Sequence, residues 1–222
     1  MLIKYFNDPP RLLSLTEILL GGVQTTLAVF ALTLLFAIPL GMLCAVGRLS
    51  KRKPISRLIA AYIYVMRGTP LMLQIMFVYF MLPMVLPFKF DRFWAVIFAF
   101  SINYAAYFAE IFRAGIQSIP VGQREAAQVL GYTRAQTFFR ILLPQIAKRV
   151  LLPVTNEVIT LVKDTALAST VAVADLMSLA KKHVSSSNSI EPYIVAMILY
   201  LLLNGVAEQL CKLAERKMSY YQ

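Results

Sequence analysis

The stretch Gln123 to Gln145, QREAAQVLGYTRAQTFFRILLPQ, decides how the rest of the chain is organised. Residues Glu125 to Leu130 are good helix formers, and Gly131 ends this helix because glycine tolerates the left-handed conformation of a helix C-terminus. Thr133 is a suitable N-cap for a second helix. The stretch therefore predicts two short helices joined by a turn.

The second helix of this pair is amphipathic. It starts at about Arg134, its apolar residues Phe138, Ile141 and Leu142 fall at i, i+3 and i+4, and Pro144 lies near its end. A helix pair with one polar and one apolar face suits the membrane surface, where one side meets lipid or spanning helices and the other is available to a soluble partner.

The composition around this pair is that of a membrane protein. Of the 222 residues, 59% are hydrophobic, and they gather in runs near or above the roughly 20 residues that cross a bilayer. The net charge of +11 resides mainly in the gaps between these runs, which favours anionic lipid headgroups over nucleic acid as its neighbours. Cys44 and Cys211 both fall in apolar segments, so we expect neither a disulfide framework nor a metal site.

Five apolar segments of the chain are long enough to span the membrane. They are Ile18 to Gly47, Leu58 to Leu86, Phe93 to Ile116, about Val150 to Met177, and Tyr193 to about Leu210. We therefore expect an all-α integral membrane protein with five transmembrane helices, forming one transmembrane domain over residues 1–222. The helix pair, in a loop of about residues 118–147, lies between the third and fourth spans, and Lys181 to Pro192 forms a polar loop on the opposite side.

The distribution of lysine and arginine sets the orientation. Two loops and the tail on the side of the helix pair hold fourteen of these residues, against six on the other side. Because positive residues favour the cytoplasmic side, we expect the N-terminus outside and the C-terminus inside, in a bacterial plasma (inner) membrane.

The helix pair also carries a resemblance. Glu125-Ala126-Ala127, three residues, Gly131, nine residues, Ile141, one residue and Leu143-Pro144 resembles the EAA loop of permease subunits of ATP-binding-cassette importers. The resemblance implies that this loop couples the permease to a cytoplasmic ATPase by docking into a groove on it, with Glu125, Ala126, Ala127 and Gly131 as coupling residues. The alternative is an amphipathic helix-turn-helix with no special role.

Two further strings, MRGTPL and YFAEIFRAGIQSI, resemble the polar-amino-acid branch of the same permeases, and the whole resemblance runs from Leu58 to about Leu176. It implies two permease subunits about a two-fold axis, an ATPase dimer below them and an extracytoplasmic substrate-binding protein above. A homodimer and a heterodimer with a sister permease both fit the sequence, and the amino acid that is carried stays open.

Polar residues inside two of the spans are candidates for substrate binding. Proline and glycine in Arg67-Gly68-Thr69-Pro70 should kink or unwind the second span, either as a tolerated kink or to turn backbone groups of Gly68 and Thr69 toward a substrate path. In the third span, Asn103, Tyr107 and Glu110 follow at i, i+4 and i+7 and share one face.

The fourth span is unusually polar for a membrane helix. Its polar and ionisable residues are Asn156, Glu157, Thr160, Lys163, Asp164 and Asp175. A charge at the bilayer centre costs about 3 kcal/mol or more unless it is paired, so these groups must be paired, wet or both. We expect a pocket formed by Gly68, Thr69, Asn103, Glu110 and Glu157. The alternative is that the same residues satisfy one another, and the roles of Lys163 and Asp164 stay open.

Other classes of function fit the sequence less well. No phosphate-binding loop G-x-x-x-x-G-K-[ST] occurs, so ATP hydrolysis is expected in a separate chain. An enzyme would need a nucleophile-base pair or a metal cluster; the sequence offers neither, and we expect no catalytic residues and no cofactor. An ion-coupled secondary transporter or channel subunit remains the alternative, although five spans without an internal inverted repeat are few for a secondary transporter.

Overall fold

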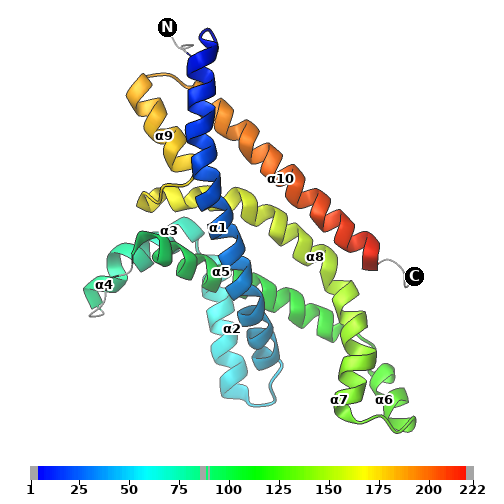
Figure 1. The fold of residues 1–222 in the computed structure, drawn as a ribbon. Coiled ribbons are helices and arrows are strands. Elements are labelled where there is room, and N and C mark those ends of the chain that lie inside the picture. Colours follow the sequence, from blue (N-terminus) through cyan, green and yellow to red (C-terminus); the bar gives the residue numbers. More distant parts are fainter. Residues whose placement is uncertain (1–4, 86–88, 90, 219–222) are drawn as a thin grey trace.

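The computed structural model describes residues 5–85, 89 and 91–218, and every regular element within them is helical. Three helices are long and apolar enough to cross a membrane: α1 (Pro9–Arg48), α5 (Arg92–Gln117) and α10 (Glu191–Met218). Figure 1 shows α1 crossing α5, with α10 running away from the N-terminal half of α1 and the short helices α6 and α7 projecting at one end. The expected all-helical membrane fold is confirmed, whereas length and apolarity alone mark three or four spans rather than five.

Helix α5 forms the centre of the fold. Its most apolar stretch is 72% buried, against 28% for α1 and 17% for α10, so most of the surface of the latter two is left uncovered by the described residues. Phe100 and Phe108 of α5 are fully buried in the main core. Helix α1 packs along α5 at close range, since a side chain at Gly41 would lie 2.6 Å from Cβ of Phe108.

The second apolar segment is broken where the sequence predicted a kink. Helix α2 (Lys53–Gly68) ends before Pro70, and the chain continues at an angle of 107° through α3 (Leu71–Met76), a π-helical turn (Phe77–Met81) and α4 (Leu82–Val85). Proline cannot donate the backbone hydrogen bond that would continue α2, so the helix stops there. The break is therefore a change of direction rather than a gentle bend.

The second helix of the pair does not end near Pro144, which corrects the sequence-based boundary. Helix α7 (Arg134–Gln136) continues through a π-helical turn (Thr137–Leu142) into α8 (Leu143–Asp164). Leu143 N–H donates to the carbonyl of Phe138, five residues back, which is the hydrogen-bond pattern of a π-helix. The hydrogen-bond register of the helix has therefore already changed before Pro144, whose missing N–H would otherwise interrupt the α-helical pattern. The helix pair is thus joined to α8 by continuous helix.

The fourth span ends at Asp164, not at Met177 as the sequence suggested. Residues Thr165–Val171 form a 3₁₀ helix, in which the hydroxyls of Thr165, Ser169 and Thr170 each donate to a carbonyl three residues back at 2.7 Å. Such local bonds compete with the α-helical pattern, and Ala172 then turns the chain at φ 56°.

The polar loop predicted from Lys181 to Pro192 is largely helical. Helix α9 (Leu176–Ser187) covers the first half of this loop. The helix begins at Leu176 because the Asp175 carboxylate accepts the N–H groups of Met177 and Ser178 and so caps its N-terminus. This helix packs against α1 and α10.

Candidate functional site

The break between α2 and α3 is held open by a side chain from α3. The amide nitrogen of Gln74 donates to the Met66 carbonyl at 3.0 Å, the Thr69 carbonyl at 3.2 Å and the Thr69 hydroxyl at 2.8 Å. Thr69 is extended, with φ −120° and ψ 146°. Carbonyls that the interrupted helix leaves without a donor thereby gain one, so the break is a built feature of the second apolar segment.

Asn103 of α5 locks this break in place. Its side chain is 4% exposed, and its amide nitrogen donates to the Met66 carbonyl and to Oε1 of Gln74, both at 3.0 Å. Both amide protons of Asn103 are used by these two acceptors. Asn103 therefore fixes where the end of α2 lies on α5.

Glu110 lies about two turns from Asn103 on the same face of α5 and has its own partner on that helix. Arg113 forms a bidentate ion pair with it, with Nη2 to Oε2 at 2.6 Å and Nε to Oε1 at 3.0 Å. The charge of Glu110 is balanced within one helical turn.

Three adjoining cavities lie along α5, and Arg67 and Tyr107 line all of them. The far cavity, on the side of α5 away from α6, has a volume of about 540 Å³. Besides Arg67 and Tyr107, its lining residues are Gly68, Thr69, Pro70, Leu71, Asn103, Tyr104, Glu157, Thr160 and Asp164. It therefore contains four of the five residues that the sequence nominated for substrate binding: Gly68, Thr69, Asn103 and Glu157.

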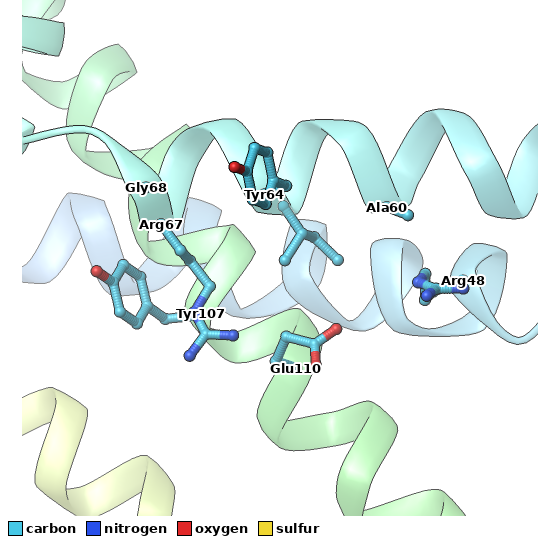
Figure 2. Close-up of a pocket in the computed structure, with 8 residues that line it drawn as sticks. Arg48, Ala60, Tyr64, Arg67, Gly68, Tyr107 and Glu110 are labelled. Atoms are coloured by element: carbon cyan, nitrogen blue, oxygen red, sulfur yellow. The ribbon is translucent and has the colours of Figure 1, made fainter.

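The other two cavities contain the fifth nominated residue, Glu110. The near cavity, about 480 Å³, extends from Tyr107 toward Ser118 and Arg149, and Glu157 also lines it. The side cavity, about 450 Å³, lies between α2 and α5. Figure 2 shows the side cavity, with Arg67 reaching from α2 toward Tyr107 and Glu110.

Arg67 and Glu157 are the charged residues lining these cavities that form neither an ion pair nor a side-chain hydrogen bond within the described part of the chain. The Arg67 guanidinium stacks over the Tyr107 ring at 5.2 Å from its centroid. Among the described residues, neither Arg67 nor Glu157 forms an ion pair or a side-chain hydrogen bond. A cation and a carboxylate that face a polar cavity without ion-pair partners can bind the two ends of a zwitterion.

Sequence reasoning missed two residues of this site. The sequence pattern placed Arg67 only in the predicted kink, although its position beside the Gly68 break puts it at the junction of all three cavities. Gln74 is the one amide side chain in the apolar run from Leu71 to Leu86, and this isolated polar residue is the sequence signal that marks it.

The turn of the helix pair has the predicted local structure. Helix α6 (Val121–Val129) ends in a left-handed Gly131 at φ 77°, with Gly131 N–H donating to the Gln128 carbonyl and Tyr132 N–H to the Ala127 carbonyl, both at 3.0 Å. These two bonds make a Schellman motif. Thr133 forms a capping box with Gln136.

The nominated coupling residues lie in different environments on this pair. Glu125, Ala126 and Gly131 are exposed, whereas Ala127 is buried. Large apolar side chains are exposed beside them: Val121, Val129, Leu130 and Phe139. The projecting pair thus presents an apolar surface that the described residues leave uncovered.

Known proteins similar to this chain are membrane components of transport systems. Residues 37–220 match the family model of the binding-protein-dependent transport system inner membrane component. The chain is 37% identical over 201 residues to the arginine transport system permease protein ArtQ of Bacillus subtilis (strain 168), covering 90% of this chain and 92% of that protein. It is 34% identical over 211 residues to the L-cystine transport system permease protein TcyB of the same strain, covering 94% of this chain and 89% of that protein.

A solved structure extends this similarity to the fold. The chain matches a crystal structure of an amino acid ABC transporter with histidines at a TM-score of 0.87 and 32% sequence identity. The match covers 98% of this chain and 100% of that chain.

Proposed function

Because this chain belongs to the family of binding-protein-dependent transport system inner membrane components, we propose that it is the permease subunit of an importer that carries a polar amino acid into a bacterial cell. Its partners are a second permease subunit, an ATPase dimer that hydrolyses ATP, and an extracytoplasmic substrate-binding protein. The similarity to permeases of arginine and cystine transport systems supports a polar amino acid as the cargo.

The observation that carries this proposal is the projecting helix pair. Val129 is 88% exposed and Leu130 is 73% exposed at the tip of α6, next to Gly131. Exposed apolar side chains on a rigid helical turn are typical of a docking surface. We assign this surface to the ATPase, with Glu125, Ala126, Ala127 and Gly131 as its coupling residues, and the continuous helix from α7 into α8 as the lever that transmits movement.

We further propose five spans in a single transmembrane domain over residues 1–222. They are α1, the broken segment from α2 to α4, α5, α8 and α10. Helix α8 is included despite its polarity because its buried face packs against the apolar spans α5 and α10. The excess of lysine and arginine on the side of α6 supports an orientation with that side and the C-terminus in the cytoplasm and the N-terminus outside.

The substrate binds, on this proposal, in the far cavity. Arg67 takes the α-carboxylate and Glu157 the α-ammonium group, since each charge is without an ionic partner among the described residues and faces the cavity. Gly68 and Thr69 contribute backbone groups at the break, Asn103 holds the break in position, and Glu110 with Arg113 lines the way to the near cavity.

The test is uptake into proteoliposomes that contain the chain, its ATPase and its binding protein. Glu157→Gln is nearly isosteric and should raise the amino acid concentration for half-maximal uptake by about 10-fold or more, as expected for losing a charged hydrogen bond of about 1.5–3 kcal/mol. Thermal stability and basal ATP hydrolysis should stay close to wild type, because Glu157 bonds no described side chain.

Glu110→Gln provides the contrast. It weakens the bidentate pair with Arg113, so its main effect should be lower stability rather than lower apparent affinity. If Glu157→Gln instead lowered stability and left apparent affinity unchanged, Glu157 would be a structural pairing residue and substrate choice would belong to the binding protein.

A further inference from the structure

A groove between α1 and α5 lies apart from the three cavities assigned to the substrate and shares no lining residue with them. Its volume is about 670 Å³, within the range of about 300–1,000 Å³ that is usual for ligand pockets. Its walls are apolar and come from both helices: Phe36, Leu40, Ile97, Phe98 and Ile102. Both helices are long and apolar enough to cross a membrane, so this α1–α5 groove belongs to the surface of two spans.

One end of the α1–α5 groove is polar. Lys89 and Asp91 line it just before the start of α5, both are exposed, and neither forms an ion pair with a described residue. Oδ1 of Asp91 accepts Phe93 N–H at 2.9 Å as the N-cap of α5, whereas Oδ2 accepts no hydrogen bond from the described residues. The neighbouring cation Arg92 is directed to the Tyr79 hydroxyl, at 3.1 Å. The polar end therefore offers one ammonium group and one carboxylate oxygen to a ligand.

Trp94 sets the depth of this polar end. It is the only tryptophan of the chain, it lines the groove three residues after Asp91, and it is 53% exposed. Tryptophan is enriched where the membrane meets water, so Lys89 and Asp91 lie at the level of the lipid headgroups. From Trp94 to Ile102 the groove follows α5 for about 12 Å, most of one half of a hydrocarbon core about 30 Å thick. A ligand that fits it has a charged head and an apolar chain.

We propose that the α1–α5 groove binds one phospholipid whose zwitterionic headgroup ends in a primary ammonium, as in phosphatidylethanolamine. Lys89 binds the phosphate, Oδ2 of Asp91 accepts a hydrogen bond from the ammonium, and an acyl chain lies along the groove as far as Ile102. A headgroup with only negative charge would meet the carboxylate of Asp91, and the trimethylammonium of phosphatidylcholine has no N–H to donate. Charge and hydrogen bonding together therefore select the headgroup.

Trp94 is an internal reporter of this lipid, because no other tryptophan contributes to the fluorescence of the purified full-length chain. The chain is reconstituted into phosphatidylcholine liposomes that contain a rising fraction of brominated phosphatidylethanolamine, phosphatidylcholine or phosphatidylglycerol, since bromine quenches tryptophan on contact. Brominated phosphatidylethanolamine should reach half-maximal quenching at a fraction about 10-fold lower than the other two, as expected for one additional charged hydrogen bond. Equal quenching by all three lipids would overturn the proposal, because it would show contact with bulk membrane lipid only.

Asp91→Asn tests the headgroup contact and keeps the start of α5, because asparagine is as good an N-cap as aspartate. This variant should lose the preference for phosphatidylethanolamine over phosphatidylcholine, and it should favour phosphatidylglycerol because Lys89 remains. Asp8→Asn is the matched control, since Asp8 is the N-cap of α1 and does not line the groove; it should keep the wild-type preference. A wild-type preference in Asp91→Asn would refute the contact with the ammonium.

A soluble headgroup separates the contribution of the chain from that of the head. Phosphorylethanolamine carries the same phosphate and ammonium without acyl chains, and it should not relieve quenching by brominated phosphatidylethanolamine. Full relief would refute the acyl chain in the groove. These measurements need neither the ATPase nor an amino acid, so a failure of amino acid uptake would refute the proposed function and leave the lipid site standing.

Discussion

Replacing Asn103 with alanine should release the break between α2 and α3. The substitution removes two hydrogen bonds of 3.0 Å, one to the Met66 carbonyl and one to Oε1 of Gln74. Each is worth about 1 kcal/mol net, and a buried acceptor left without a donor costs a further 1–3 kcal/mol. The Met66 carbonyl keeps its bond from Gln74, so Oε1 of Gln74 is the group that is stranded. We expect a loss of about 3–5 kcal/mol in the free energy of unfolding.

The assay is reversible unfolding of the purified chain in mixed micelles with rising sodium dodecyl sulfate. Ser101→Ala is the matched control, because Ser101 lies two residues away on α5 and its buried hydroxyl has no hydrogen-bond partner in the described residues. The control should unfold like wild type or slightly later. Equal unfolding of Asn103→Ala and Ser101→Ala would refute the idea that Asn103 fixes the break.

The helix pair and the topology give two further predictions. Gly131→Val and Glu125→Lys should each abolish substrate-stimulated ATP hydrolysis while leaving membrane insertion intact, because valine disfavours φ 77° and a reversed charge alters the exposed docking face. Gly122→Val is the control and should be much milder, because Gly122 is exposed with open space around it. Wild-type coupling in Gly131→Val and Glu125→Lys would exclude the coupling role. In a cysteine-free background, a membrane-impermeant thiol reagent added to intact cells should label Ser186→Cys and spare Ser50→Cys; the reverse pattern would invert the topology.

Local chemistry made the helix pair predictable. The left-handed Gly131 and the Thr133 capping box depend on residues within four positions of each other, so the sequence pattern specified them. The end of the pair was not predictable in the same way. Pro144 normally marks a boundary, but the π-helical turn before it lets the helix run on into α8, where Leu142 and Ile146 on either side of the proline are buried in the main core.

The end of the fourth span illustrates a second limit. Apolar residues continue past Asp164, so hydrophobicity alone extended the span to Met177. Three hydroxyls that bond carbonyls three residues back, together with the left-handed Ala172, end it earlier. Short segments of this kind have weak sequence signals because many side chains tolerate either helix.

By itself, the sequence determined that the chain is an all-helical membrane protein, where its charges concentrate, and which polar residues lie inside apolar segments. Only the tertiary structure decided how those residues are used. Asn103 bonds a carbonyl 37 positions earlier in the chain, and Glu157 faces a cavity with no partner among the described residues. The periodicity of a helix fixes which face a side chain occupies, but the partner on that face comes from another segment, and its position depends on how all the helices pack together.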